Sequence, residues 1–85
     1  MEQMASARST GAIDRHVGIR IRLRRRILQM SSQTLAAKLG VTLQQVERYE
    51  NGASRIGAAG LFSLACTLKV PVGYFFEGFD PALKR

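Results

Sequence analysis

The sequence predicts an all-α fold, a compact single domain of five short helices. Apolar residues recur at helical intervals, and two expected helices are separated by a break of only three residues. The stretch I-R-I-R-L-R at 19–24 alternates like a β-strand, but no turn signal or partner strand follows it. The chain has 85 residues and a 46% hydrophobic composition, which allows one modest core. We expect a disordered N-terminal arm over 1–12, the folded domain over 13–79 and a short tail over 80–85.

The first expected helix covers residues 13–30. Asp14 favours its start, because a carboxylate is stabilised near the positive end of the helix dipole. Arg24 fills a gap in an otherwise apolar series. The apolar positions, which recur at multiples of about one helical turn, are Ile13, Val17, Ile21 and Leu28.

The next two helices are joined by a very short connection. Ser31 or Ser32 can cap the start of the first, and Gly40 can end it in a left-handed conformation. Thr42 followed by Gln45 is the pattern of a capping box, in which two unpaired amides at a helix start are satisfied. Two helices joined so closely predict a helix-turn-helix.

The second helix of this pair, residues 43–50, has two chemically different sides. The inward side carries Leu43, Val46, Tyr49 and Glu50, and the outward side carries Gln44, Gln45, Arg48 and Asn51. Glutamine can pair with adenine and arginine with guanine in the DNA major groove. A solvated polar face is the alternative, but the tight turn and the basic helix before it favour base recognition.

The C-terminal part predicts a core helix followed by a short closing helix. The core helix follows the spacing of a buried helical face, with Leu61, Leu64, Ala65 and Leu68 inward. The sequence V-P-V at 70–72 breaks it, and residues 73–77 can form a last helix. We expect its aromatic run at 74–76 to pack in the core, with one ring left for a dimer contact.

The charge distribution predicts a polyanionic partner. The formal net charge is +7, and the pI is about 10.8. Nine basic residues between positions 15 and 55 oppose only Glu47 and Glu50. Nucleic acid is the first candidate and an anionic membrane the second. The basic residues are Arg15, Arg20, Arg22, Arg24, Arg25, Arg26, Lys38, Arg48 and Arg55.

Other classes of function find little support in the sequence. No apolar run is long enough for a transmembrane helix, and no secretory signal is present at the N-terminus. Cys66 alone cannot form an internal disulfide, and with His16 alone it cannot complete a zinc site. The sequence shows no nucleophile–base pair and no paired carboxylates of the kind that would indicate an enzyme. We therefore expect a cytoplasmic protein with no cofactor and no membrane partner.

Several motifs occur in an order and spacing typical of one family. They are R-I-R-L-R-R (20–25), L-A-A-K-L-G-V-T (35–42), Q-Q-V-E-R-Y-E-N-G (44–52), R-I-G-A (55–58) and V-P-V-G-Y-F-F-E-G (70–78). In these motifs the span from Val17 to Gly78 resembles the Cro/C1-type helix-turn-helix family of phage repressors and bacterial regulators. The resemblance implies a lambda-repressor-like fold that binds double-stranded DNA.

The resemblance also implies roles for individual residues. The positions that touch base edges in the family are occupied by Thr42, Leu43, Gln44, Gln45 and Arg48. Those that touch phosphates are occupied by Ser32, Asn51 and Arg55, with Gln33 one residue after the usual glutamine position. Arg25 and Glu50 match a structural ion pair between the first and third helices.

Two other residues depart from the family pattern. Gln29 stands in the first interhelical turn where the family has glycine, so a left-handed conformation there would cost about 1 kcal/mol. Glu47 lies on a helix expected to face DNA, where it would repel phosphate unless it pairs with an arginine or accepts from cytosine.

We expect a sequence-specific transcriptional regulator, most simply a repressor, that binds DNA as a homodimer. We expect the dimer surface around residues 72–79. The arginines at 22–26 are expected to contact the DNA backbone, with a membrane-surface helix or a solvated face as alternatives. An antitoxin of a toxin–antitoxin pair and a protein–protein adaptor are the alternative functions.

Overall fold

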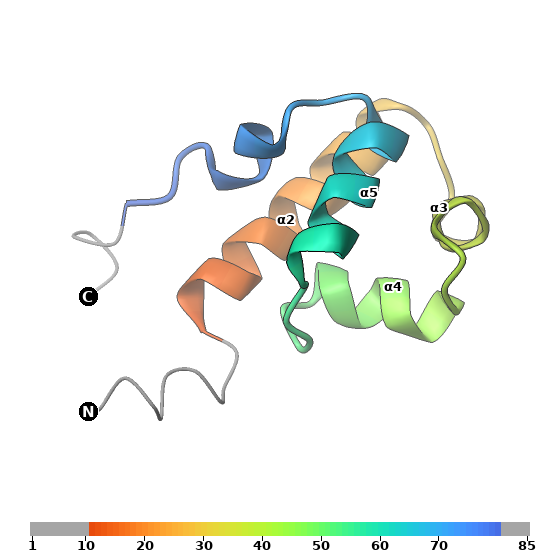
Figure 1. Cartoon of the computed structure of the whole chain (residues 1–85), viewed down its shortest axis with the longest axis horizontal. Helices are drawn as coiled ribbons and strands as arrows, with labels where there is room; N and C mark the ends of the chain where they lie inside the picture. Colours follow the sequence, from red (N-terminus) through yellow and green to blue (C-terminus); the bar gives the residue numbers. More distant parts are fainter. Residues whose placement is uncertain (1–10, 81–85) are drawn as a thin grey trace.

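The structure, a computed structural model described over residues 11–80, contains four α-helices and a 3₁₀ helix and no β-strand within that range (Figure 1). Residues 1–10 and 81–85, which include most of the expected arm and tail, lie outside the described range. None of the described helices has both the length and the apolar character that crossing a membrane requires. The elements in chain order are α2 (Ala12–Ile27), α3 (Ser32–Leu39), α4 (Leu43–Glu50), α5 (Ala58–Leu68) and η1 (Val72–Phe76).

The all-α prediction is confirmed, but the expected fifth α-helix is a 3₁₀ helix. Pro71 precedes η1 in an extended conformation, and the element has only five residues. Gly73 lies inside it and Gly78 follows at φ +84°, so a longer α-helix has little local support.

Helix α2 is one continuous helix, so the strand-like alternation at 19–24 reflects no strand. It ends at Ile27, three residues before the expected Met30. The reason is Gln29, whose φ of +57° places it in the left-handed region. The amides of Leu28, Gln29 and Met30 then bond back to carbonyls of the last helical turn.

One hydrophobic core joins all five elements. Phe75 of η1 is completely buried, and each large apolar side chain buried in this way contributes about 1.5–3 kcal/mol. Ile13, expected in the core, is instead 43% exposed. Arg24, which interrupts the apolar series, donates from its Nε to the Leu68 carbonyl, 2.9 Å away. The buried apolar residues are Val17, Ile21, Leu35, Ala36, Val46, Leu64, Ala65, Leu68 and Phe75.

Helix α2 lies at the centre of the fold and contacts α4, α5 and η1. In Figure 1, α5 lies alongside α2 while α4 runs along one edge of the molecule, with α3 seen end-on beside it. The crossing of α2 and α4 is close because Gly18 has no side chain. A Cβ atom there would lie 2.6 Å from the Glu50 carbonyl oxygen, a distance that only a backbone shift could relieve.

The closing segment is held against α2 by polar contacts as well as by Phe75. His16 donates from Nε2 to the Glu77 carbonyl at 2.6 Å, and its ring packs on that of Phe79 with the centroids 5.4 Å apart. Arg20 stacks on the Tyr74 ring, 4.0 Å from its centroid, and pairs with Glu77 at 2.8 Å. These contacts fix η1 on the side of α2 remote from Gly18.

The left-handed residue in the first turn yields a stability prediction. Replacing Gln29 with glycine should raise the free energy of unfolding by up to about 1 kcal/mol, because only glycine adopts this conformation without Cβ strain. Urea unfolding should detect the gain. Ala37→Gly, at an exposed position further inside α3, should instead destabilise by about 0.5–1 kcal/mol. A loss of stability in Gln29→Gly would contradict the assignment of strain to this turn.

Candidate nucleic-acid interface

The connection between α3 and α4 is closed by backbone and side-chain caps. Ser31, not Ser32, caps α3, and its Oγ accepts from the Thr34 amide at 3.0 Å. Gly40 ends α3 with a φ of +74°, as predicted. Thr42 caps α4, with its Oγ1 accepting from the Gln45 amide at 3.0 Å. The start of α4 therefore has a defined direction relative to α3.

The predicted capping box at the start of α4 forms only in part. The Gln45 side chain does not bond back to the Thr42 amide; its Nε2 donates to Ser54 Oγ at 3.2 Å. Arg48 reaches the same hydroxyl from its Nε at 3.3 Å, and its Nη2 donates to the Ala53 carbonyl at 3.3 Å. Two of the proposed base-contacting side chains are thus tied to the loop after α4.

The outward face of α4 is otherwise open. Gln44 is exposed and makes no side-chain hydrogen bond within the described residues. Thr42 is exposed beside it, while Leu43 is half-buried. Of Gln44, Gln45 and Arg48, only Gln44 can meet a base edge without first breaking a hydrogen bond within the described residues.

Ser54 is a residue of this site that the sequence did not single out. It lies in the irregular segment between α4 and α5, outside every motif of the helical pattern. Its hydroxyl accepts from both Gln45 and Arg48, so it sets where two long side chains rest. Because it belongs to no helix, helical spacing could not mark it.

The positions assigned to phosphate lie at the start of α3 and after α4. Ser32 and Gln33 occupy the first turn of α3, where backbone amides have no intrahelical partner and can bind an anion. Arg55 is exposed in the loop before α5. Asn51 is exposed as well, but its Oδ1 accepts from Arg22 Nη2 at 3.0 Å. The NH2 group of its side-chain amide remains available to donate to a phosphate oxygen.

A buried carboxylate holds α4 to α2. Glu50 is only 6% exposed, and its Oε2 lies 2.7 Å from Arg25 Nε. Arg25 Nη2 donates to the other oxygen at 3.0 Å, and Arg22 Nε approaches the same oxygen at 3.3 Å. The hydrogen bond with Glu50 raises the pKa of Arg25, while burial acts in the opposite direction. A charge buried this deeply requires such partners.

Three of the four arginines at 22–26, which were expected to form a phosphate footprint, bond acceptors within the domain. Arg22 and Arg25 point toward Glu50, and Arg24 bonds the end of α5. Arg26 is exposed and makes no hydrogen bond or ion pair within the described residues. Their contact with the DNA backbone was predicted from charge alone, whereas the directions of these long side chains are set by acceptors elsewhere in the fold.

This arrangement, a capped short helix set by a tight turn against a second helix, is matched by a family model. The model described as Helix-turn-helix covers residues 21–75. The chain belongs to the Cro/C1-type helix-turn-helix family of transcriptional regulators. The resemblance noted in the sequence is therefore confirmed.

Bacterial regulators are similar to this helix-turn-helix chain. An uncharacterized HTH-type transcriptional regulator of Sinorhizobium medicae is 52% identical over 65 residues, which are 76% of this chain and 47% of the relative. An uncharacterized transcriptional regulator in the ATPase CF(0) region of Rhodospirillum rubrum is 41% identical over 76 residues, covering 89% of this chain and 70% of the relative. The chain thus spans about half the length of the Sinorhizobium relative it matches.

A solved structure extends the comparison to three dimensions. The restriction-modification controller protein C.AhdI from Aeromonas hydrophila superposes with a TM-score of 0.70 at 26% sequence identity. The match covers 73% of this chain and 94% of the controller protein. The lambda-repressor-like architecture expected from the sequence is confirmed, with η1 in place of a fifth α-helix.

The buried ion pair yields a second stability prediction. Glu50→Ala should lower the free energy of unfolding by about 3–5 kcal/mol, because it leaves a partly buried guanidinium without its counter-charge. Thermal unfolding followed by circular dichroism measures the loss. The control is Glu77→Ala, which removes a 64% exposed partner of Arg20 and should cost less than about 1 kcal/mol. Equal melting of the Glu50 variant and the parent would refute the role of the pair.

Proposed function

We propose that this chain binds double-stranded DNA sequence-specifically and acts as a transcriptional repressor by occupying promoter sites. The observation that carries the proposal is the outward face of α4, where Gln44, Gln45 and Arg48 lie on a helix whose start is capped and whose end is anchored by Glu50. A helix held in this way can enter the major groove with its N-terminal half toward the bases. In this role the protein works in the cytoplasm, with DNA as its partner, and requires no catalysis or cofactor.

The proposed contacts fall into two groups. Base edges are contacted from α4, by Gln44 at once and by Gln45 and Arg48 after they leave Ser54. Exchanging a hydrogen bond to Ser54 for one to a base costs little net free energy, since each such bond is worth about 0.5–1.5 kcal/mol. Thr42 and Leu43 complete the base-contacting set. Phosphates are contacted by Ser32, Gln33, Asn51 and Arg55.

We further propose that the protein binds DNA as a two-fold dimer, because one helix makes too few base contacts to select a site in a genome. The segment 72–79 supports this less well than α5 does, since Phe75 is buried and its exposed large hydrophobic residues, Val72 and Phe76, are only 38% and 36% exposed. Helix α5 contains no charged residue, whereas the whole chain carries +7. Two such copies repel one another least across this face.

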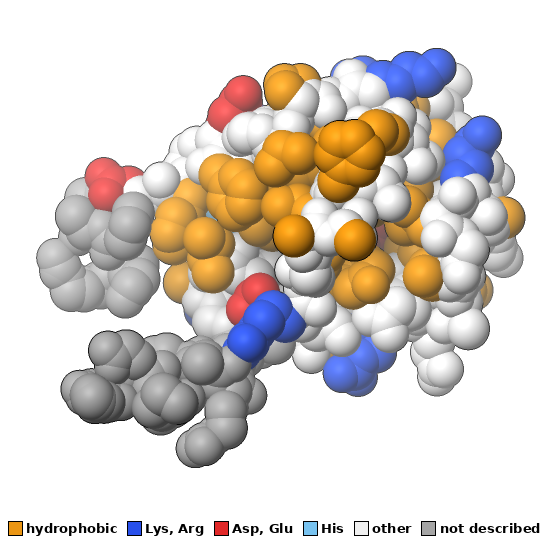
Figure 2. All heavy atoms as spheres, in the orientation of Figure 1, with side chains coloured by type: hydrophobic (Ala, Val, Ile, Leu, Met, Phe, Trp, Pro, Cys, Tyr) orange, Lys and Arg blue, Asp and Glu red, His pale blue; other side chains and the backbone are white. Residues whose placement is uncertain are grey.

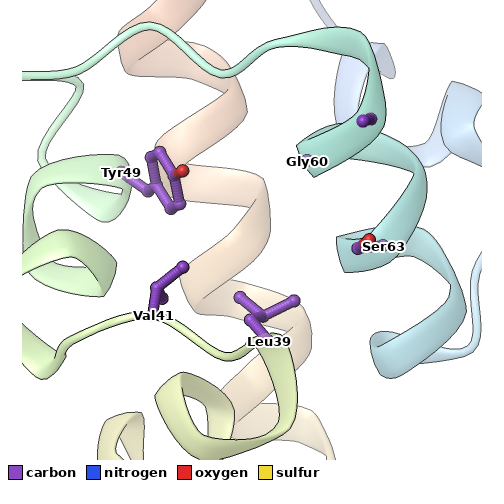
Figure 3. Close-up of a pocket in the computed structure, with 6 residues that line it drawn as sticks. Leu39, Val41, Tyr49, Gly60 and Ser63 are labelled. Carbon is purple, nitrogen blue, oxygen red and sulfur yellow. The ribbon is translucent and has the colours of Figure 1, made fainter.

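The outer face of α5 has a shape that suits self-association. Phe62 projects from it and is 64% exposed. Beside it, Tyr49, Gly60 and Ser63 line a half-open hollow of about 160 Å³ above Leu39 and Val41 (Figure 3). Figure 2 shows hydrophobic side chains gathered over α5 and η1, with Lys and Arg at the rim. A projection and a hollow on the same face can fit each other twice across a two-fold axis.

Base recognition is tested by comparing two kinds of variant on duplexes chosen from a random library. Gln44→Ala should cost about 1–3 kcal/mol on the preferred site and relax the preference at one base pair. Arg55→Ala should weaken binding to every duplex alike and reduce the salt dependence by about one counter-ion. If Gln44→Ala lowered affinity equally on all duplexes, the assignment to base contacts would be wrong. Failure to select any duplex would favour the adaptor alternative, whereas co-purification of a second small protein would favour the antitoxin.

The dimer is tested at Phe62. Phe62→Ser should weaken dimerisation on DNA by at least about tenfold, because a central aromatic residue of an interface typically contributes about 2 kcal/mol. Sedimentation of the DNA complex and footprinting measure the effect, and the parent should protect two half-sites about 34 Å apart. Ile19→Ser, which removes a similarly exposed apolar residue from α2, should change neither. Protection of one half-site by the parent at saturation, with 1:1 stoichiometry, would exclude the dimer.

A further inference from the structure

An apolar row on α2 is used by neither the core nor the proposed DNA and dimer surfaces. It consists of Ile19, Leu23 and Ile27, which are 60%, 42% and 58% exposed. Residues spaced four apart lie on one side of a helix, so the three form a continuous strip about 12 Å long. Three large aliphatic side chains aligned on an otherwise strongly basic helix are costly to leave in water.

The position of the row separates it from DNA. Gly18 marks the side of α2 that touches α4. At about 100° per residue, Ile19, Leu23 and Ile27 lie about 100°, 140° and 180° around the helix from Gly18. Arg15 lies against Gly52 in the loop after α4, whereas the part of the row formed by Leu23 and Ile27 faces away from α4. DNA bound to α4 therefore leaves Leu23 and Ile27 open. Helix α5, with the proposed dimer face, packs on a different side of α2, near Arg24.

The charges around the row select the kind of partner. Arg15 precedes Ile19 by four residues and Arg26 follows Leu23 by three, so both arginines border the row. Both are exposed, and neither makes a hydrogen bond or ion pair within the described residues. A second copy of the chain would bring the same positive charges against them, which disfavours self-association here. A partner with carboxylates would be attracted.

We propose that this basic apolar row, defined by Ile19, Leu23 and Ile27 with Arg15 and Arg26, docks an acidic amphipathic helix of a partner protein. Apolar residues of that helix, three and four apart, pack along the row, as in other helix-to-surface recognition. Glutamate or aspartate beside them pairs with the two arginines. An anionic membrane suits the surface less well, because the row is narrow and the chain has no tryptophan to lie at a lipid interface.

The probe is a synthetic peptide of about 20 residues, with leucines three and four apart and glutamates elsewhere. Titrated into the isotope-labelled full chain, with and without DNA, it should shift the nuclear magnetic resonance signals of Ile19, Leu23 and Ile27 in both states. The triple variant Ile19→Ser, Leu23→Ser, Ile27→Ser should bind the peptide at least about tenfold more weakly. Phe62→Ser, an equally exposed apolar change on α5, should bind it as the parent does.

Two controls separate this mode from simple charge attraction and from lipid binding. A scrambled peptide of the same composition should bind at least about tenfold more weakly than the amphipathic one. Phosphatidylglycerol vesicles should show no binding that depends on the row. If the triple variant loses its fold, Arg15→Gln with Arg26→Gln provides the second test and should also weaken binding. Any of three results would overturn the proposal. The two peptides could bind equally well, the variants could bind the amphipathic peptide as strongly as the parent does, or the vesicles could bind through the row while the peptide does not bind.

Discussion

The structure depends on one buried carboxylate. Glu50 ends α4, the helix that carries the proposed base contacts, and points into the fold where an unpaired charge would be costly. Arg25 on α2 donates two hydrogen bonds to it, and Arg22 donates a third. Arg22 also donates to the Asn51 side chain through its other nitrogen, Nη2. The same contacts that neutralise the charge therefore set the position of α4 on the central helix. The absence of a side chain at Gly18 allows the close approach that they require.

This anchor leaves the outward face of α4 rigid at the backbone and adjustable at its side chains. Gln44 makes no side-chain hydrogen bond within residues 11–80, whereas Gln45 and Arg48 share the Ser54 hydroxyl. Holding two long side chains in the free protein reduces the conformational entropy they have left to lose on binding. The loop that supplies Ser54 also carries Arg55. A residue that holds two proposed base-contacting side chains is therefore adjacent in sequence to a proposed phosphate contact.

Three surfaces of this small domain differ in chemistry in a way that suits three partners. The α4 face is polar with basic edges, which suits DNA. The α5 face is uncharged and carries Phe62 beside a hollow, which suits a second copy of a basic chain. The exposed side of α2 combines an aliphatic row with two arginines that have no ion-pair partner among residues 11–80, which suits an acidic helix. Because α2 packs against both α4 and α5, all three surfaces are positioned by the same helix.

The sequence by itself determined the all-α class, the helix-turn-helix and its caps, since these follow from local rules: Gly40 accepts a left-handed conformation and Thr42 satisfies an amide three residues away. Resemblance to the family supplied the pairing of Arg25 with Glu50, which the structure contains. Only the tertiary structure decided which arginines of α2 turn inward, where Gln45 and Arg48 rest, and that Ile19, Leu23 and Ile27 stay exposed. The physical reason is that these features depend on elements distant in sequence. A long polar side chain bonds whichever acceptor the fold brings near it, and an apolar residue is buried only if another element covers it.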